Sequence, residues 1–503
     1  MYFQSFRDLL ANHSHQTATR WQKGLPMIFL VLSLGACGGG GGGSDSTASQ
    51  GEVLIALTDD QGDFVTYTVD VLSVKLTHAN GNIVETLPLN TRVDFTRYTD
   101  LTEFVTAATV PNGRYVRGSI VLDYSNADIQ VEDANGNAVP VASIVDQNGA
   151  PVTTVQTAVE LNGQNSLPIA PGIPRSLVLD FDLEASNVVS FNGSEIKLTV
   201  DPVLKADVDP RAPIEYRVRG PLRSVNLSND SFRAYIRPFF HPIRTGAGVF
   251  GSLKVNTSDQ TLYEIDGVTY TGTEGLRVLE GMPELTAVIA RGELSFTPMR
   301  LQAREVYAGS SVPGGTMDVV RGTVVERNGN VIGVKGATLV RTDGTVVFND
   351  HVSVELGDST IVTRQGSAET FGIQAISVGQ AITAFGTLTN DSVSDMRFSA
   401  ANGYARMYLS ILKGDVVQLS DNVSPLALDL DSINGRSVSL YDFEGTGADA
   451  GSNADPAFYE IETSTLGLET VMLSDHATVS GFATPFGTAA PDFTAQTVAT
   501  KKQ

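Results

Sequence analysis

One stretch of the chain combines basic and aromatic side chains at a spacing that suits anion binding. Residues 211–254 contain eight basic and two acidic residues, although the whole chain has 34 Lys and Arg, 56 Asp and Glu, and a net charge of −22. Within residues 232–237, apolar residues alternate with basic or aromatic ones, so a strand would turn the second set outward. Such a face suits anionic glycans or single-stranded nucleic acid. The predicted ligand-binding residues are Arg233, Tyr235, Arg237, Phe239, Phe240, His241 and Arg244.

These arginines have a second interpretation, which the sequence leaves open. They can pair with acidic residues of neighbouring domains and so fix how those domains are oriented. The chain carries many more carboxylates than basic groups, so partners for such pairs are plentiful.

Two acidic groups have the oxygen chemistry that Ca²⁺ prefers. Asp59, Asp60 and Asp63 lie close together after the first predicted strand, and Asp180 and Asp182 are two residues apart on another. Residues two apart on a strand share a face, so the second pair of carboxylates would lie together. We therefore consider Ca²⁺ as the one candidate cofactor. The alternative is an ordinary solvated acidic face.

The sequence contains no catalytic motif that we recognise. It has no Gly-x-Ser-x-Gly turn, no phosphate-binding glycine loop and no His-Glu-x-x-His helix. Asp475 and His476 are adjacent, but neighbouring residues on a strand point to opposite faces, so we do not expect them to act as a pair. We therefore predict that the protein is not an enzyme. The rival is a hydrolase acting on polysaccharide, which needs two carboxylates converging in one pocket.

The only cysteine of the chain stands at the end of its first long apolar run. Residues 27–34 follow Arg20 and Lys23; this run is shorter than the roughly 20 residues that span a bilayer and suits a secretory signal peptide. Leu-Gly-Ala-Cys at 34–37 resembles a bacterial lipobox, whose cysteine accepts diacylglycerol. The resemblance implies a signal peptide over 1–36, lipid on Cys37 and an outer-membrane location, since glycine follows the cysteine. The alternative is a buried free cysteine near an ordinary cleavage site.

The residues after Cys37 predict a flexible connection. Six consecutive glycines occupy 38–43, and glycine-rich segments behave as flexible chains. We expect a tether over 37–50 that links the lipid to the folded domains. An envelope location favours a glycan over nucleic acid as the anionic ligand, so nucleic acid is not expected as a partner.

The rest of the chain has the pattern of β structure. Asn-Gly or Asp-Gly pairs recur, for example at 80–81, 266–267 and 434–435, and such pairs favour hairpin turns. The alternation of apolar residues changes phase at Leu72, which predicts a β-bulge. Only one segment, 100–107, has a helical pattern, with Asp100 as N-cap and Glu103 three residues later.

The first domain resembles a known but uncharacterised family. Its motifs are Gly-Glu-Val-Leu-Ile-Ala-Leu-Thr-Asp at 51–59, Val-Pro-Asn-Gly-Arg-Tyr at 110–115, Leu-Val-Leu-Asp-Phe-Asp at 177–182 and Asp-Pro-Val-Leu at 201–204. Together they resemble a family of bacterial secreted and lipoprotein domains of unknown function. The resemblance implies a β-sandwich over 51–207 and supplies no catalytic residue. A charged, proline-containing linker follows at 207–213.

Beyond this linker, three elements recur in the same order. Arg-Gly at 219–220 and 321–322 and Lys-Gly at 413–414 each open a predicted strand. A second glycine element recurs at 292, 386 and 481, and a third element closes each unit near 300, 397 and 493. The glycines of the second element are 94 and 95 residues apart. A repeat of this length is too long for a stacked solenoid. The units, 214–309, 316–408 and 409–500, resemble an uncharacterised bacterial repeat family and suggest small OB-like barrels, separate as beads.

These patterns predict an all-β protein, with an N-terminal β-sandwich followed by three tandem OB-like barrels. We expect a non-catalytic lipoprotein of the cell envelope that acts as a surface or periplasmic binding and scaffolding module. It would contact the membrane through its lipid and bind an anionic polysaccharide or an envelope protein. The rivals are a secreted polysaccharide hydrolase and a Ca²⁺-dependent adhesion module.

Overall fold

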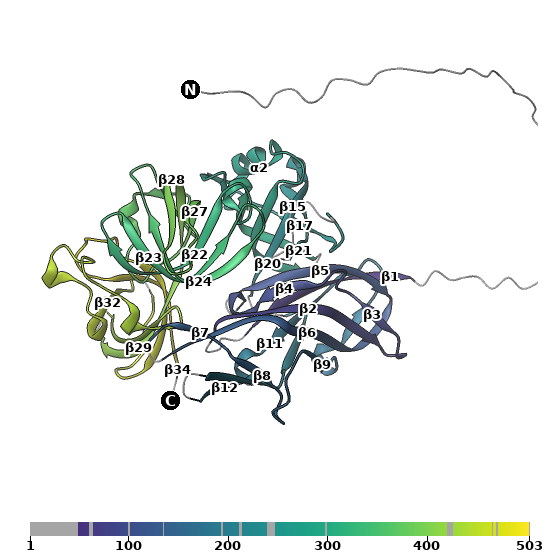
Figure 1. Ribbon diagram of the computed structural model, residues 1–503. Coiled ribbons are helices and arrows are strands. Elements are labelled where there is room, and N and C mark those ends of the chain that lie inside the picture. Colours follow the sequence, from purple (N-terminus) through teal and green to yellow (C-terminus); the bar gives the residue numbers. More distant parts are fainter. Residues whose placement is uncertain are drawn as a thin grey trace, which may run out of the picture. The chain divides into compact units, whose positions relative to one another are not determined.

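A computed structural model describes residues 49–59, 64–98, 101–133, 135–192, 195–210, 214–238, 247–296, 299–419, 426–464, 466–468 and 471–501. These residues form β structure almost throughout, which confirms the predicted class (Figure 1). Over these ranges α-helix is limited to α1 (Leu183–Ser186) and α2 (Gly272–Glu280). No helix in the described part is long and apolar enough to cross a membrane. The predicted signal peptide, Cys37 and most of the predicted tether lie outside the described residues.

The N-terminal part resembles a β-sandwich. In one sheet, β1 (Gln50–Thr58) lies between β5 (Thr102–Pro111) and β11 (Arg175–Phe181), and β14 (Leu204–Val208) extends it. In the other, β2 (Phe64–His78) pairs with β6 (Gly113–Glu132). Tyr67 of β2 and Phe181 of β11 are both fully buried, with ring centroids 6.0 Å apart, so the sheets pack face to face. Shorter strands are β3 (Ile83–Glu85), β4 (Thr91–Asp94), β7 (Ala138–Pro140), β8 (Ser143–Val145), β9 (Thr154–Glu160), β10 (Leu167–Ile169), β12 (Asn187–Asn192) and β13 (Glu195–Val200).

Local features of these strands follow the sequence closely. The pairing of β2 with β6 shifts register between Val71 and Ser73, which confirms the bulge predicted at Leu72. The glycines of the predicted turns adopt positive φ, for example 88° at Gly81 and 77° at Gly435. This is the region that hairpin turns require and that glycine enters without a steric penalty.

The first C-terminal unit closes five strands into a circuit. Its members are β15 (Glu215–Asn226), β16 (Ser231–Tyr235), β17 (Ser252–Asn256), β21 (Met299–Ala308) and β20 (Ala287–Phe296). Each strand pairs with the next in that order, and β20 pairs back to β15. Only β17 and β21 are parallel. The hairpin β18 (Leu262–Ile265) and β19 (Val268–Thr271) adds to β21.

The second and third units repeat this order of strands. In the second unit the strands pair in the order β22 (Asp318–Asn328), β23 (Val331–Val340), β24 (Val346–Glu355), β28 (Met396–Tyr408) and β27 (Ala381–Asn390), and β27 pairs with β22. The third runs β29 (Ser410–Gln418), β30 (Leu426–Ile433), β32 (Tyr459–Glu462), β34 (Phe493–Lys501), β33 (His476–Ala483) and back. Short strands β25 (Ile361–Arg364), β26 (Thr370–Phe371) and β31 (Arg436–Ser437) lie beside these circuits. Figure 1 shows β22, β23, β24, β27 and β28 gathered as one green group.

The sandwich and the first barrel-like unit share a sheet and a core. Strand β15 pairs in parallel with β5, placing Arg217 opposite Glu103. One cluster of buried apolar residues extends from Val53 in β1 to Ala308 in β21. The sandwich and the first barrel-like unit are therefore joined through backbone pairing and a common core.

The helix predicted over 100–107 is wrong. Asp100 lies outside the described residues, and Thr102–Pro111 is strand β5, paired with both β1 and β15. Its β-branched residues, such as Val105 and Thr106, favour a strand. Two sheet neighbours satisfy the backbone of β5, and this outweighs the local capping pattern.

Candidate functional site

The predicted binding face on β16 is only partly formed. Phe232, Ala234 and Ile236 are buried, while Arg233 and Tyr235 remain partly exposed, as the alternation predicts. Arg233 Nη1 donates to Ser252 Oγ at 3.3 Å. The guanidinium of Arg223 lies 5.4 Å from the centre of the Tyr235 ring.

Arg237 departs from the prediction that it lines the outside. It is only 3% exposed, because β16 ends at Tyr235 and the alternation of the strand does not continue to residue 237. Burial lowers the pKa of Arg237 below its ordinary value. The remaining predicted residues of this face, Phe239, Phe240, His241 and Arg244, lie outside the described residues.

The described members of the two predicted acidic groups, Asp59, Asp180 and Asp182, have protein partners. Asp59 is buried and accepts from the backbone N–H of Leu183 at 3.1 Å; Asp60 and Asp63 lie outside the described residues. The Nζ of Lys205 lies 2.6 Å from Asp182 and 3.9 Å from Asp180. A lysine therefore already supplies positive charge where Ca²⁺ was considered, and calcium binding stays a prediction.

Asp182 also has a local role at a helix start. Its carboxylate accepts from the backbone N–H of Ala185 at 2.8 Å and caps α1. Burial acts to raise the pKa of Asp182, but the hydrogen bonds from Lys205 and Ala185 outweigh it, so the pKa lies below its ordinary value.

His476 meets two carboxylates that the sequence did not assign to it. Its Nδ1 lies 3.1 Å from Asp415 and 3.5 Å from Asp431, on the neighbouring strands β29 and β30. These three side chains offer ligand atoms within 4.8 Å of one another, a spacing that can hold a metal ion. Asp475 instead accepts from the backbone N–H of Met472, in line with the expectation that Asp475 and His476 do not act as a pair.

One concave feature of the described residues is a cavity of about 340 Å³. Six arginines line it, whereas Glu215 is the one carboxylate among its lining residues. We call it the arginine cavity. Its arginines are Arg97, Arg217, Arg219, Arg291, Arg321 and Arg406.

Equivalent strands of the three C-terminal units build the walls of the arginine cavity. In the first unit, Arg219 on β15 lies opposite Ile289 on β20. In the second, Arg321 on β22 lies opposite Thr383 on β27. In the third, the corresponding strands β29 and β33 contribute Ile411 and Ser480. The repeated Arg-Gly positions, 219–220 and 321–322, thus lie at one shared site.

A buried carboxylate on β5 holds two of the arginines. Glu103 is fully buried and bonds Arg217, and it accepts from Arg219 Nε at 3.3 Å. Burial alone acts to raise the pKa of Glu103, but the charges of Arg217 and Arg219 outweigh it and place the pKa below its ordinary value. Glu103 therefore stays ionised. This pairing fits the second interpretation of the basic stretch, in which its arginines contact acids of a neighbouring domain.

Two further arginines of the cavity are also paired. Arg291 Nη2 lies 2.6 Å from Glu215, which also binds Arg304 at 2.7 Å. Arg406, only 1% exposed, donates its Nε to Glu264 at 2.9 Å and its Nη1 to the Tyr408 hydroxyl at 3.0 Å. These contacts fix both guanidinium groups with defined orientations.

Arg321 differs from these residues. Across the described residues it forms no ion pair, and its nearest charge-stabilising partner is the ring of Tyr408, 5.4 Å away. Its side chain reaches solvent where it lines the cavity. Although Arg321 is exposed, the surrounding protein removes part of its hydration, and the charges of Arg97, Arg217 and Arg291 add to this effect, so that the pKa of Arg321 is lowered to about 9. Water solvates part of this charge, but no carboxylate of the described residues forms an ion pair with it.

A hydroxyl group stands next to this arginine. Thr383 lies opposite Arg321 in the sheet, lines the same cavity and is 1% exposed. Its Oγ1 has no hydrogen-bond partner in the described part of the chain. A buried hydroxyl without a partner is unfavourable, so Thr383 keeps an unused hydrogen-bonding group beside Arg321, on a residue that lines the cavity.

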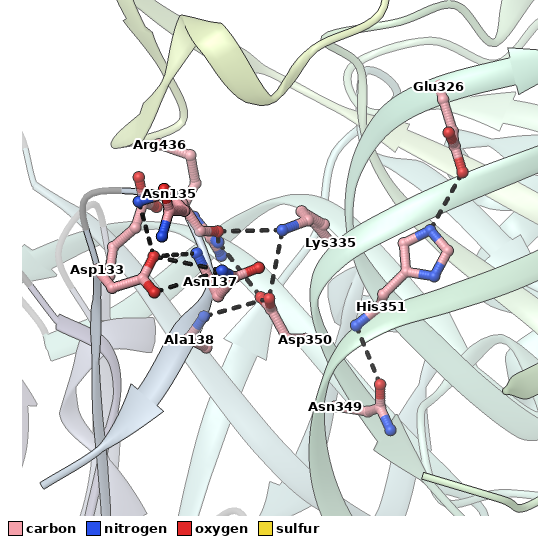
Figure 2. Close-up of polar contacts among 12 residues, drawn as sticks. Asp133, Asn135, Asn137, Ala138, Glu326, Lys335, Asn349, Asp350, His351 and Arg436 are labelled. Atoms are coloured by element: carbon pink, nitrogen blue, oxygen red, sulfur yellow. Dashed lines mark hydrogen bonds and ion pairs between the residues drawn. The ribbon is translucent and has the colours of Figure 1, made fainter. Parts of the chain in front are cut away.

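A second charged cluster joins other parts of the chain (Figure 2). Arg436 bonds Glu132 and lies 3.2 Å from Asp350. Lys335 Nζ lies 3.3 Å from Asp350 and 3.0 Å from the carbonyl oxygen of Gly136. We call these residues the Arg436 cluster. It links the second and third barrel-like units to the sandwich, and both of its cations meet carboxylates. His351 and Glu326, also drawn in Figure 2, form a separate exposed pair at 3.2 Å.

Comparison with known families identifies one part of the chain. Residues 50–202 match the domain of unknown function DUF4382. This agrees with the resemblance seen in the sequence to an uncharacterised domain. The DUF4382 domain contributes Thr96, Arg97 and Leu101 to the lining of the arginine cavity. Searches of curated proteins and of solved structures found no match to the chain.

The sequence did not predict the arginine cavity as a site. Its signal was present in the recurring basic residue before glycine, at 219, 321 and 413. We read that element as the start of a strand, and only the arrangement of the units brings Arg219 and Arg321 to one space.

Proposed function

We propose that the protein is a non-catalytic binding module of the cell envelope that holds an anionic ligand in the arginine cavity. The observation that carries this proposal is Arg321, which lines a cavity and has no ion pair among the described residues, beside the Thr383 hydroxyl, which has no hydrogen-bond partner there either. An anion there gains charge-assisted hydrogen bonds and compensates the guanidinium.

The chemistry of the cavity favours binding over hydrolysis. Glycoside hydrolysis generally uses two carboxylates that flank the bond to be cleaved. Glu215 is the one carboxylate among the lining residues, and Arg291 and Arg304 both hold it in ion pairs. It is therefore poorly placed to act as an acid or a base.

The cavity is a better anion site than the outer face of β16. There, Arg237 is buried and Arg233 already donates to Ser252. In the cavity, the surrounding protein lowers the effective dielectric constant and strengthens each interaction with an anion. An acidic polysaccharide remains a candidate partner, now through a terminal residue that enters the cavity.

The scaffold of this site is a set of three OB-like barrels, which we propose from their common strand order. The five strands of each circuit are numbered here in chain order, so that β15, β16, β17, β20 and β21 are the first to fifth strands of the first unit. In each unit the first strand pairs with the second and the fourth, and the third lies parallel to the fifth. OB-folds are five-stranded barrels that bind oligonucleotides and oligosaccharides. OB-folds bind these ligands on the face of their second and third strands. In this protein, parts of the first and fourth strands of each unit line the cavity instead.

The envelope location rests on the lipobox at residues 34–37. We propose that Cys37 carries the lipid and that the glycine run acts as a tether between the membrane and the DUF4382 domain. Metabolic labelling of bacteria with an alkyne fatty acid should label the wild type and not Cys37→Ser. Equal labelling of both proteins would contradict the lipid anchor.

Anion binding is tested by thermal melting of the chain in a buffer free of multivalent anions. Sugar phosphates, sugar acids, inorganic phosphate and polygalacturonate are added in turn. We expect at least one of them to raise the melting temperature in the wild type, since a ligand that binds only the folded state stabilises it. Arg321→Met should abolish the rise. Arg397→Gln, which removes an exposed arginine paired only with Asp395, should keep it. A rise that survives Arg321→Met, or no rise with any of these anions, would contradict the proposed function.

A further inference from the structure

The size and lining of the arginine cavity indicate what kind of anion it takes. Its volume is about 340 Å³. This is near the lower end of the range of about 300–1,000 Å³ for small-molecule sites. A bare phosphate or sulfate ion would leave much of this space to water, whereas a single sugar ring with one anionic substituent would fill it.

The uncharged lining suits the body of such a molecule. Thr96, Gln365 and Ser480 bring polar side chains from three different parts of the chain. Thr96 Oγ1 also donates to Asp94, and the hydroxyl of Ser480 bonds that of Thr497. Val319 on β22 and Ile411 on β29 add apolar groups to the lining. A sugar ring presents hydroxyl groups around its edge and C–H groups on its faces, so it can satisfy both kinds of surface.

The charged lining indicates where the anionic group lies. The arginines at 217, 291 and 406 are each held by a carboxylate. In the part of the chain that the structure describes, Arg321 has no such carboxylate, and the hydroxyl of Thr383 opposite it has no hydrogen-bond partner. An anionic group placed between these two side chains gains one guanidinium and one hydroxyl donor without breaking an existing ion pair.

We propose that the ligand of the arginine cavity is a phosphorylated or acidic monosaccharide whose anionic group binds Arg321 and Thr383. This inference rests on the proposed function and adds the class, size and orientation of the ligand. Phosphate and carboxylate heads share the chemistry required here, so the experiment tests both.

The test is calorimetric titration of the chain with five probes. Glucose 6-phosphate and glucuronate represent the proposed class. Inorganic phosphate represents the head group alone, glucose the body alone, and polygalacturonate a polymer. We expect at least one sugar anion to bind roughly tenfold more tightly than both inorganic phosphate and glucose, a difference of about 1.4 kcal/mol.

Two variants connect this affinity to the proposed contacts. Arg321→Met should weaken the sugar anion by at least tenfold, and the exposed control Arg397→Gln should leave its affinity unchanged. Thr383→Val keeps the branched shape of the side chain in the strand and removes only the hydroxyl. It should weaken the sugar anion several-fold, which keeps the proposal testable if Arg321→Met does not fold.

Each other outcome separates the inference from the proposed function. If inorganic phosphate binds as tightly as the sugar anions and depends on Arg321, the cavity binds anions but the sugar-sized ligand is wrong. The same holds if polygalacturonate alone binds with that dependence. If no probe binds in a way that depends on Arg321, both the inference and the proposed function fail.

Discussion

The arginine cavity and the Arg436 cluster both contain basic side chains and carboxylates, but they differ in how these groups are paired. In the Arg436 cluster, Arg436 and Lys335 both meet Asp350, and Arg436 also bonds Glu132. In the arginine cavity, Glu103 and Glu264 hold their arginines in the same way, but Arg321 lines the cavity and forms no ion pair with any described residue.

This difference teaches how to separate a structural contact from a binding site in an acidic protein. Cations that pair with carboxylates at a junction hold parts of the chain together, and most of their hydrogen-bond donors are already used. A cation that lines a cavity without such a pair keeps its charge and its donors available to a ligand. Removing a matched charge should therefore affect stability, whereas removing Arg321 should affect binding.

The largest loss of stability is expected from Glu103→Gln. This change leaves the buried Arg217 and the partly buried Arg219 with no full counter-charge from β5. Breaking a buried ion pair in this way typically costs about 3–5 kcal/mol. Urea denaturation should show this loss in the free energy of unfolding. The exposed control Arg397→Gln should change the free energy of unfolding far less, because water screens an exposed ion pair, and similar losses in the two variants would contradict the structural role of Glu103.

Ionisation of Glu103 should also make the stability of the protein depend on pH. This effect should be no larger than the loss of stability expected in Glu103→Gln. The pKa of Glu103 lies below its ordinary value of 4.5 in the folded protein, so its stabilisation is fully present above pH 4.5. It is lost as the pH falls through the lower, folded-state pKa. Melting temperatures from pH 7 to 3 should therefore fall less steeply at the acid end in Glu103→Gln than in the wild type. Parallel curves would contradict the assignment.

A smaller loss is expected when the Arg436 cluster is broken. Arg436→Met removes the contacts to Glu132 and Asp350, whose side chains are 22% and 23% exposed. Because water partly compensates these carboxylates, we expect a loss of about 1–2 kcal/mol, between the values for exposed and buried pairs. Calorimetric melting measures it. A loss as large as that of Glu103→Gln would show that this junction is not the weaker of the two.

The smallest change in stability is expected from Arg321→Met in a buffer without multivalent anions. The change removes a poorly compensated charge but also its contact with the Tyr408 ring, which is worth about 0.5–2 kcal/mol. The two effects oppose each other, so the melting temperature should change little or rise. A drop comparable to that of Arg436→Met would indicate a structural role for Arg321 and blur the distinction between the two regions.

Much of the local structure could be predicted from the sequence because it depends on near neighbours in the chain. The bulge at Leu72 follows from a change in the phase of apolar residues, and the turn at Gly81 from the preceding asparagine. The errors lie where distant strands decide. Glu103 belongs to a strand and not a helix because β1 and β15 flank it, and Arg237 is buried because β16 ends two residues earlier.

The candidate site shows the same division. The repeated basic residue before glycine, at 219 and 321, was visible in the sequence, and so was the option that nearby arginines pair with acids elsewhere. The sequence contains no information on distance between units, however. It could not indicate that Arg219 pairs with Glu103 whereas Arg321 does not.

The sequence by itself determined the β class, the hairpins and the recurrence of one strand pattern in three units, because alternation and turn residues act over a few positions. Only the tertiary structure decided which recurring arginines meet a carboxylate and which one is left facing a cavity. The physical reason is that a salt bridge depends on the separation of two charges in space. That separation is set by strands such as β5 and β15, which come from distant parts of the chain.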